Sequence, residues 1–237
     1  MKHHSPLQQE GGTRAALSPS RAAPEFPAVD VMATAEPFGY RVSRRLFDLV
    51  FGFLILLLIA PVVPLLAVMI RLDSPGPILY RQTRIGQGGR RFTFLKFRSM
   101  YAGSDRKLDE LAALNEQAGP IFKMRDDPRI TPVGRFLRRS SLDEIPQILN
   151  VLRGDMSIVG PRPALPAEVS KYEPWQRRRL EARPGLTCLW QISGRSHIGF
   201  DEWMRLDVEY LRTRSLWTDV VILAKTIPAV MARRGAY

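Results

Sequence analysis

The longest apolar run in the chain extends from Leu49 to Ile70 and contains no charged residue. A helix over this range would be roughly 33 Å long at about 1.5 Å per residue, which matches the hydrocarbon core of a bilayer. The run is apolar on every face and longer than a buried core helix needs to be. The pattern therefore predicts a membrane segment.

Two prolines interrupt this run past its middle. Pro61 and Pro64 each remove a backbone donor and are expected to bend a helix. Basic residues outnumber acids on both flanks, and the positive-inside tendency places both flanks on the cytoplasmic side. The sequence thus favours a re-entrant helical hairpin over residues 41–72, with a single span as the open alternative.

The flanking regions differ in character. Residues 1–40 are rich in Pro, Ala, Ser and Gly and have no apolar periodicity, which predicts a disordered tail. Residues 73–237 are expected to form a cytosolic domain at the membrane interface. Its predicted elements are a β-hairpin around the IGQGG turn, an amphipathic helix over 104–117, a short helix ending near Gly154, and an apolar segment over 215–234 that suits either the interface or the core. The predicted fold class is α+β and predominantly helical.

Composition narrows the chemistry. The formal net charge of +12 and the pI near 10.5 indicate an anionic partner, which could be nucleic acid, an anionic membrane or a phosphorylated molecule. Cys188 is the single cysteine, so an internal disulfide is excluded. Two of the three histidines, His3 and His4, lie in the tail, which leaves no cluster suited to zinc. A hard, oxygen-liganded ion such as Mg²⁺ fits this composition better.

Four basic residues are candidates for binding phosphate. Lys96 and Arg98 lie two apart on a predicted strand and would face the same side, although ordinary headgroup contacts explain them almost as well. Arg138 supplies positive charge together with Arg135 and Arg139 just before an acid pair. Arg162 lies between two prolines, so its planar fork would lose little entropy on binding an anion.

The acid pair Asp143 and Glu144 lies in the stretch SSLDEIPQ at 140–147. One interpretation is a capping box, because Ser141 and Glu144 match S-x-x-E at a helix start. Pro146 argues against that start, since it is tolerated only if the helix begins at Asp143 or later. In both cases the acids lie at a positive helix end beside arginines, where a phosphate can be held nearby.

The motifs around the acid pair resemble those of a known family. The run TPVGRFLRRSSLDEIPQILNVLRGDMSIVGPRP, with KFRSM before it and RPGLTCLWQISGR after it, is similar to the monotopic phosphoglycosyl transferases, or bacterial sugar transferases, over about residues 41–237. The resemblance implies a monotopic protein of the bacterial inner membrane with its catalytic domain on the cytoplasmic face. It also implies transfer of hexose 1-phosphate from a UDP-sugar to undecaprenyl phosphate with release of UMP, the first membrane step of exopolysaccharide or surface glycan synthesis. Similarity to the short exopolysaccharide-initiating members favours UDP-glucose or UDP-galactose.

The resemblance also implies roles for individual residues. Asp143 would attack the sugar-bearing phosphate and hold a covalent phosphosugar, and Glu144 would help to bind Mg²⁺. Arg138 and Arg162 match arginines that contact phosphate, and Lys96 and Arg98 belong to the KFRSM motif. One departure concerns the membrane break, where many members carry Ser-Pro and this chain carries Ala60-Pro61.

Two further segments have less specific patterns. Trp175 with Arg177, Arg178 and Arg179 suits the headgroup region of a membrane. The acids of the segment 201–210 are expected mainly on a solvated helix face; these are Asp201, Glu202, Asp207 and Glu209.

The competing hypothesis is a non-catalytic basic membrane adaptor that binds anionic lipid or nucleic acid. Its binding would weaken steeply with salt whatever the state of Asp143. The transferase hypothesis instead gives UDP-sugar, undecaprenyl phosphate and inner-membrane lipid as partners and expects no nucleic acid. The sequence leaves open whether the chain forms a homodimer.

Overall fold

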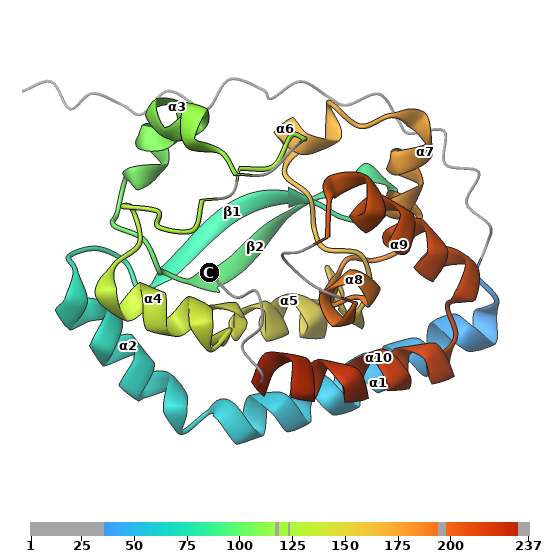
Figure 1. Ribbon diagram of the computed structural model, residues 1–237. Helices are drawn as coiled ribbons and strands as arrows, with labels where there is room; N and C mark the ends of the chain where they lie inside the picture. Colours follow the sequence, from blue (N-terminus) through green and yellow to red (C-terminus); the bar gives the residue numbers. More distant parts are fainter. Residues whose placement is uncertain (1–35, 117–118, 123, 194–197, 232–237) are drawn as a thin grey trace, which may run out of the picture.

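The computed structural model describes residues 36–116, 119–122, 124–193 and 198–231, and over these ranges the chain is mostly helical with four β-strands (Figure 1). The predicted α+β class is confirmed. Most of the predicted N-terminal tail, residues 1–35, lies outside the described ranges.

The apolar run forms two helices with a bend between them. Helix α1 (Phe38–Ile59) and helix α2 (Val62–Asp73) meet at 63°. No single helix in the described ranges is long and apolar enough to cross a membrane, whereas this bent pair passes the same test of length and composition. Pro61 lies at the break, but Pro64 lies inside the first turn of α2 and does not interrupt it, because a proline there removes no intrahelical hydrogen bond.

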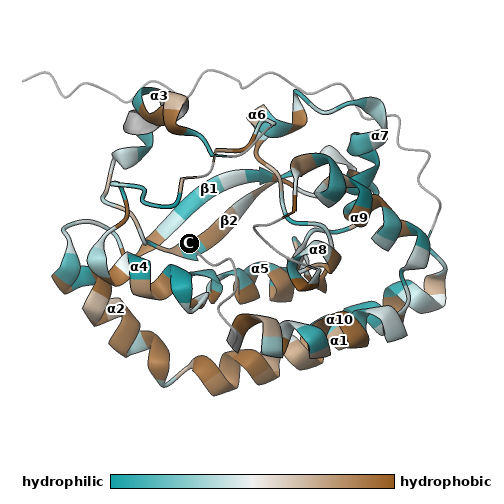
Figure 2. Cartoon of the chain, viewed as in Figure 1, coloured by the Kyte–Doolittle hydropathy of each residue, from teal (hydrophilic) through white to brown (hydrophobic). Residues whose placement is uncertain are grey.

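One side of the bent pair is apolar and exposed. Figure 2 shows hydrophobic colouring along the lower edge of the molecule, over α2 and much of α1. On α1 the exposed apolar residues recur every three or four positions, so they line one face of the helix. These residues are Phe38, Val42, Leu46, Val50, Phe53, Leu54, Leu57 and Leu58 on α1 and Val62, Leu65, Val68 and Leu72 on α2.

The other side of α1 is held by buried polar contacts. The Asp48 carboxylate accepts hydrogen bonds from Ser157 Oγ and Ile158 N, both at 2.8 Å. Arg44 Nη2 donates to Val159 O at 2.6 Å. Because Arg44 and Asp48 are one helical turn apart, a single face of α1 binds a segment more than a hundred residues away in the sequence.

The predicted β-hairpin is present. Strands β1 (Leu79–Ile85) and β2 (Arg91–Phe97) pair antiparallel, with Leu79 opposite Phe97 and Ile85 opposite Arg91. The connection is a short 3₁₀ turn, η1 (Gln87–Gly89), in which two glycines adopt positive φ. Phe94 of β2 enters the main core, whose largest members also include Phe47, Ile148, Val151, Met156 and Ile158.

The segment with the densest motifs runs beneath the hairpin in Figure 1. It comprises α4 (Pro132–Arg139), η4 (Leu142–Glu144) and α5 (Gln147–Arg153). Helix α5 ends where the sequence predicts, because Gly154 takes φ 90° and caps it.

A two-stranded parallel ladder joins distant parts of the chain and has no local sequence signal. Strand β3 (Ser157–Val159) pairs with β4 (Gly185–Thr187). A Cβ at Gly185 would lie 2.1 Å from Gly160 N, so the two backbones meet where side chains cannot fit. This contact fixes the start of the GPRP loop.

The remaining elements cover the hairpin and the ladder. The helix predicted over 104–117 is instead divided into three short pieces, and residue 117 lies outside the described ranges. Within the predicted segment 215–234, Leu216–Met231 form a helix with one face in the core, at Ile222, and another exposed, at Trp217, whereas residues 232–234 lie outside the described ranges. In chain order these elements are η2 (Ser104–Lys107), α3 (Leu108–Leu111), η3 (Ala112–Leu114), α6 (Pro166–Val169), α7 (Pro174–Arg177), η5 (Arg178–Glu181), α8 (Leu189–Ile192), α9 (Phe200–Thr213) and α10 (Leu216–Met231).

Candidate active site

The acid pair and one lysine form the centre of the candidate site. Lys96 Nζ lies 3.4 Å from Asp143 Oδ2 and 3.3 Å from Glu144 Oε1. Lys96 comes from the end of β2, whereas the acids come from η4. Asp143 is 5% exposed, so its carboxylate is shielded from bulk water and held beside one cation.

The turn before the acids has an unusual backbone. Ser141 takes φ 58°, and it is the one non-glycine residue with positive φ in the part of the chain that the structure describes. Its side chain makes no capping hydrogen bond, so the predicted capping box is wrong. The left-handed turn directs the chain from α4 into η4, and α5 then begins at Gln147, directly after Pro146. Strain of this kind is often found at functional sites.

Asn150 ties the acid-bearing segment to the strand that carries Lys96. Its Nδ2 donates to Thr93 O at 2.7 Å, and its Oδ1 accepts from Leu95 N at 3.2 Å. Asn150 is fully buried on α5. Because β2 and α5 are clamped by one amide, Lys96 and the acids keep a fixed separation.

Arg138 approaches the site from α4. Its Nε donates to Ser99 Oγ at 3.0 Å. Burial lowers the pKa of Arg138, and the Asp143 carboxylate acts in the opposite direction, which places that carboxylate within electrostatic reach of the guanidinium. The contact with Ser99 depends on Gly134, because a Cβ there would lie 2.0 Å from Ser99 O.

Replacing Gly134 with alanine is therefore expected to lower the free energy of unfolding by about 3 kcal/mol, because backbone at Ser99 must move to admit the methyl group. The activity of the candidate site should fall as well, since Arg138 moves with α4. Gly39→Ala is the matched control, because Gly39 is also helical and has open space around it. Thermal unfolding of both purified variants checks this, and equal melting temperatures would contradict it.

Arg162 is placed by two other arginines. Arg179 Nη2 donates to Arg162 O at 2.8 Å, and Arg84 Nη1 donates to Pro163 O at 3.0 Å. Burial lowers the pKa of Arg84 to about 10, and the charge of Arg162 adds to that effect. The half-buried guanidinium of Arg162 has no hydrogen-bond or ion-pair partner within the described ranges, so it remains available to an anion.

Arg179 and Asp207 form a buried ion pair, which corrects two sequence-based predictions. Arg179 Nη2 lies 2.6 Å from Asp207 Oδ2, and both side chains are 1% exposed. Arg179 therefore lies away from the headgroup region, and Asp207 is not on a solvated face. Burial raises the pKa of Asp207 to about 6, while Arg179 acts in the opposite direction. A spacing pattern cannot reveal such a long-range pair.

Arg98 does not share the surroundings of Lys96, contrary to the prediction from strand alternation. It lies one residue beyond β2, and its guanidinium donates to Pro75 O, Ile70 O and Ser74 O. These carbonyls belong to the end of α2 and the turn after it. Arg98 thus caps the second helix of the bent pair, whereas Lys96 contacts the acids.

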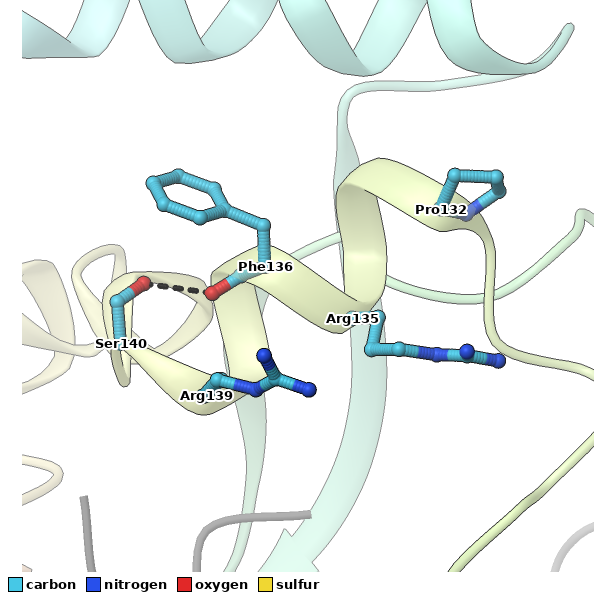
Figure 3. A pocket seen from close by; sticks show the side chains of 5 residues that line it. All are labelled: Pro132, Arg135, Phe136, Arg139 and Ser140. Atoms are coloured by element: carbon cyan, nitrogen blue, oxygen red, sulfur yellow. Dashed lines mark hydrogen bonds between the residues drawn. The ribbon is translucent and has the colours of Figure 1, made fainter.

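A shallow pocket of about 250 Å³ lies on the outer face of α4. Figure 3 shows Arg135 and Arg139 extending along one side of the helix, with the Phe136 ring on another. Ser140 Oγ donates to Phe136 O at 2.8 Å and closes one end. The last residue that lines the pocket, Ser140, lies three residues before Asp143, but none of the predicted site residues lines it.

The residues present fit Mg²⁺ only in part. No group of three or more His, Cys, Asp or Glu side chains that could hold a metal occurs in the described parts of the chain. Mg²⁺ commonly uses one or two carboxylates and takes its other ligands from water and substrate phosphates. Asp143 and Glu144 supply that number of carboxylates.

Several known proteins are similar in sequence to this chain. The chain is 44% identical over 201 residues to the galactosyl transferase CpsE of Streptococcus agalactiae, which covers 84% of the chain but 44% of CpsE. It is 40% identical over 232 residues to the exopolysaccharide production protein ExoY of Rhizobium meliloti, covering 96% of the chain and 100% of ExoY. It is 43% identical to the UDP-glucose:undecaprenyl-phosphate glucose-1-phosphate transferase of Caulobacter vibrioides, covering 83% of the chain and 72% of that protein. Residues 39–233 match the family model described as bacterial sugar transferase, and the chain therefore belongs to the bacterial sugar transferase family.

Proposed function

We propose that this protein transfers hexose 1-phosphate from a UDP-sugar to undecaprenyl phosphate through a covalent intermediate on Asp143. The observation that carries the proposal is the buried Asp143 with the half-buried Glu144 beside Lys96, in a chain of a sugar transferase family. Relatives named for UDP-glucose, galactose and undecaprenyl phosphate support the substrate classes. Membership in this family favours an enzyme over a non-catalytic adaptor.

In the first step, an Asp143 carboxylate oxygen attacks the phosphorus that bears the sugar. A new P–O bond forms to Asp143, the bond to the bridging oxygen breaks, and UMP leaves with that oxygen and its electron pair. In the second step, an oxygen of undecaprenyl phosphate attacks the same phosphorus and the carboxylate is released. Lys96, Arg138 and Arg162 supply positive charge for these anions.

Mg²⁺ belongs to this proposal, with Glu144 as the residue that would help to hold it. When bound, the ion would offset repulsion between the carboxylates and the phosphates. Lys96 already contacts both acids, so this lysine can keep them together before substrate arrives.

The membrane geometry that we propose is a re-entrant pair, α1 and α2, dipping into the cytoplasmic leaflet of the inner membrane. The 63° bend and the exposed apolar face of both helices support it. The catalytic residues would then lie at the surface of that leaflet, where a lipid phosphate is found. Both ends of the pair would lie on the cytoplasmic side.

The test uses the full chain in detergent with Mg²⁺, undecaprenyl phosphate and separate UDP-sugars. We expect UMP release and lipid-linked sugar with UDP-glucose or UDP-galactose, and loss of both when Mg²⁺ is removed by a chelator. Absence of UMP with every UDP-sugar would overturn the proposal. A product with UDP-N-acetylhexosamines alone would change the sugar but keep the reaction.

A further inference from the structure

Gln147 has a buried amide with an unmade hydrogen bond. It is the first residue of α5 and is 2% exposed. Its Nε2 has no hydrogen-bond partner among the described residues. An orphaned buried donor is destabilising, so proteins rarely retain one without a reason.

Gln147 shares this feature with the indole Nε1 atoms of Trp190 and Trp203, and it differs from them in lying next to the acid pair in the chain. Most of the other buried unpaired atoms belong to charged side chains that have a further partner, namely Arg44, Asp48, Arg98, Arg179 and Asp207. Asn150, one turn later on α5, is equally buried but uses both ends of its amide. Gln147 has neither a further partner, as those charged side chains do, nor a fully hydrogen-bonded amide, as Asn150 does. This indicates that its partner is absent from the unliganded chain.

The backbone places Gln147 next to the acid pair. Ile145 and Pro146 both take right-handed helical angles, so the chain keeps helical geometry from η4 into α5. Residues three and four apart on a helix are neighbours on its surface. Gln147 therefore follows Asp143 and Glu144 on the same side of this segment.

We propose that the Gln147 amide donates a hydrogen bond to an oxygen of the hexose 1-phosphate group while that group is attached to Asp143. A neutral donor adds direction without charge, and the three nearby cations already provide charge. The inference rests on the proposed function and adds a substrate-binding residue to it. A hydrogen bond made only with substrate discriminates strongly against analogues that lack the acceptor.

The test compares Gln147→Met with Gln176→Met. Gln176 is matched because it is 4% exposed and has a satisfied contact, with its Oε1 accepting from Glu173 N at 2.9 Å. Gln147→Met should keep or raise the melting temperature, because it removes an unpaired donor, whereas Gln176→Met should lower it. For UMP release, kcat/KM should fall about 10- to 100-fold in Gln147→Met and stay near wild type in Gln176→Met.

Two results would overturn the inference. One is wild-type kcat/KM in Gln147→Met. The other is a loss of melting temperature in Gln147→Met as large as in Gln176→Met, which would indicate a structural role. If Gln147→Met does not fold, Gln147→Leu replaces it, because leucine also lacks a donor and adds no charge, and the same loss of kcat/KM is expected. If the wild-type chain releases no UMP from any UDP-sugar, the proposed function itself has failed.

A set of monodeoxy UDP-hexoses identifies the accepting oxygen. If a sugar hydroxyl accepts, one deoxy analogue should be a poor substrate for the wild type, and its disadvantage should disappear in Gln147→Met. If a phosphoryl oxygen accepts, every analogue should lose the same factor in Gln147→Met. Both patterns support the inference, whereas equal activity of wild type and variant on all analogues contradicts it.

Discussion

Asp143→Asn should lower UMP release by about 1,000-fold or more, because an amide cannot replace a carboxylate as the attacking nucleophile. The variant should still fold, since Asn keeps the size of the side chain. In a single turnover with labelled UDP-sugar and no lipid, the wild type should form a protein-bound phosphosugar and Asp143→Asn should form none. Mass spectrometry of the labelled peptide measures this directly.

The matched control is Asp201→Asn, which changes an exposed carboxylate on α9 and should retain activity and the adduct. Glu144→Gln should lose activity but keep its nucleophile, so a slow adduct is expected. An adduct of normal yield in Asp143→Asn would place the nucleophile elsewhere.

Removing Asp207 should destabilise the protein by about 3–5 kcal/mol, because Arg179 would remain charged and unpaired in the interior. Asp207→Ala should also reduce activity, since Arg179 holds the backbone of Arg162. The double variant Arg179→Met/Asp207→Leu should recover part of the stability, because it leaves no buried charge without a partner. Chemical denaturation of Arg179→Met, Asp207→Leu and the double variant gives the coupling energy.

Arg178→Met serves as the comparison. The Arg178 side chain is 44% exposed and pairs with Glu181 at 3.1 Å, so its removal should cost about 0–1 kcal/mol. If Arg179→Met costs no more than Arg178→Met, the buried pair does not support the fold as described.

Local signals in the sequence predict local structure well. The glycine-rich turn predicts the hairpin, and Gly154 predicts the end of α5, because each depends on backbone preferences of a few residues. The capping box fails because the chain turns at Ser141 through a left-handed conformation that its sequence does not require. The predicted bend at Pro64 is absent because helix α2 starts just before this residue.

Long-range contacts account for what the sequence cannot reveal. Strands β3 and β4 are short, and each exists because the other is present. No sequence motif separates the supporting residues from ordinary surface or core residues; these are Arg84, Arg179, Asn150 and Gln147. Only the folded chain brings them to the site. Family resemblance gives Asp143 and Arg162 their expected roles, whereas their supporting contacts come from the structure.

The contacts of α1 have a consequence for how this protein can be made. Asp48 satisfies two donors of β3, and Arg45 donates to Val151 O and Leu152 O at the end of α5. A chain shortened to remove α1 and α2 would leave these groups without partners and uncover the core around Phe94 and Val151. Helices α1 and α2, which we propose meet the lipid, thus also complete the interior of the rest of the chain. On the membrane geometry proposed above, the rest of the chain completes its core only together with the two helices that insert into the bilayer. A fragment starting at residue 73 is expected to aggregate.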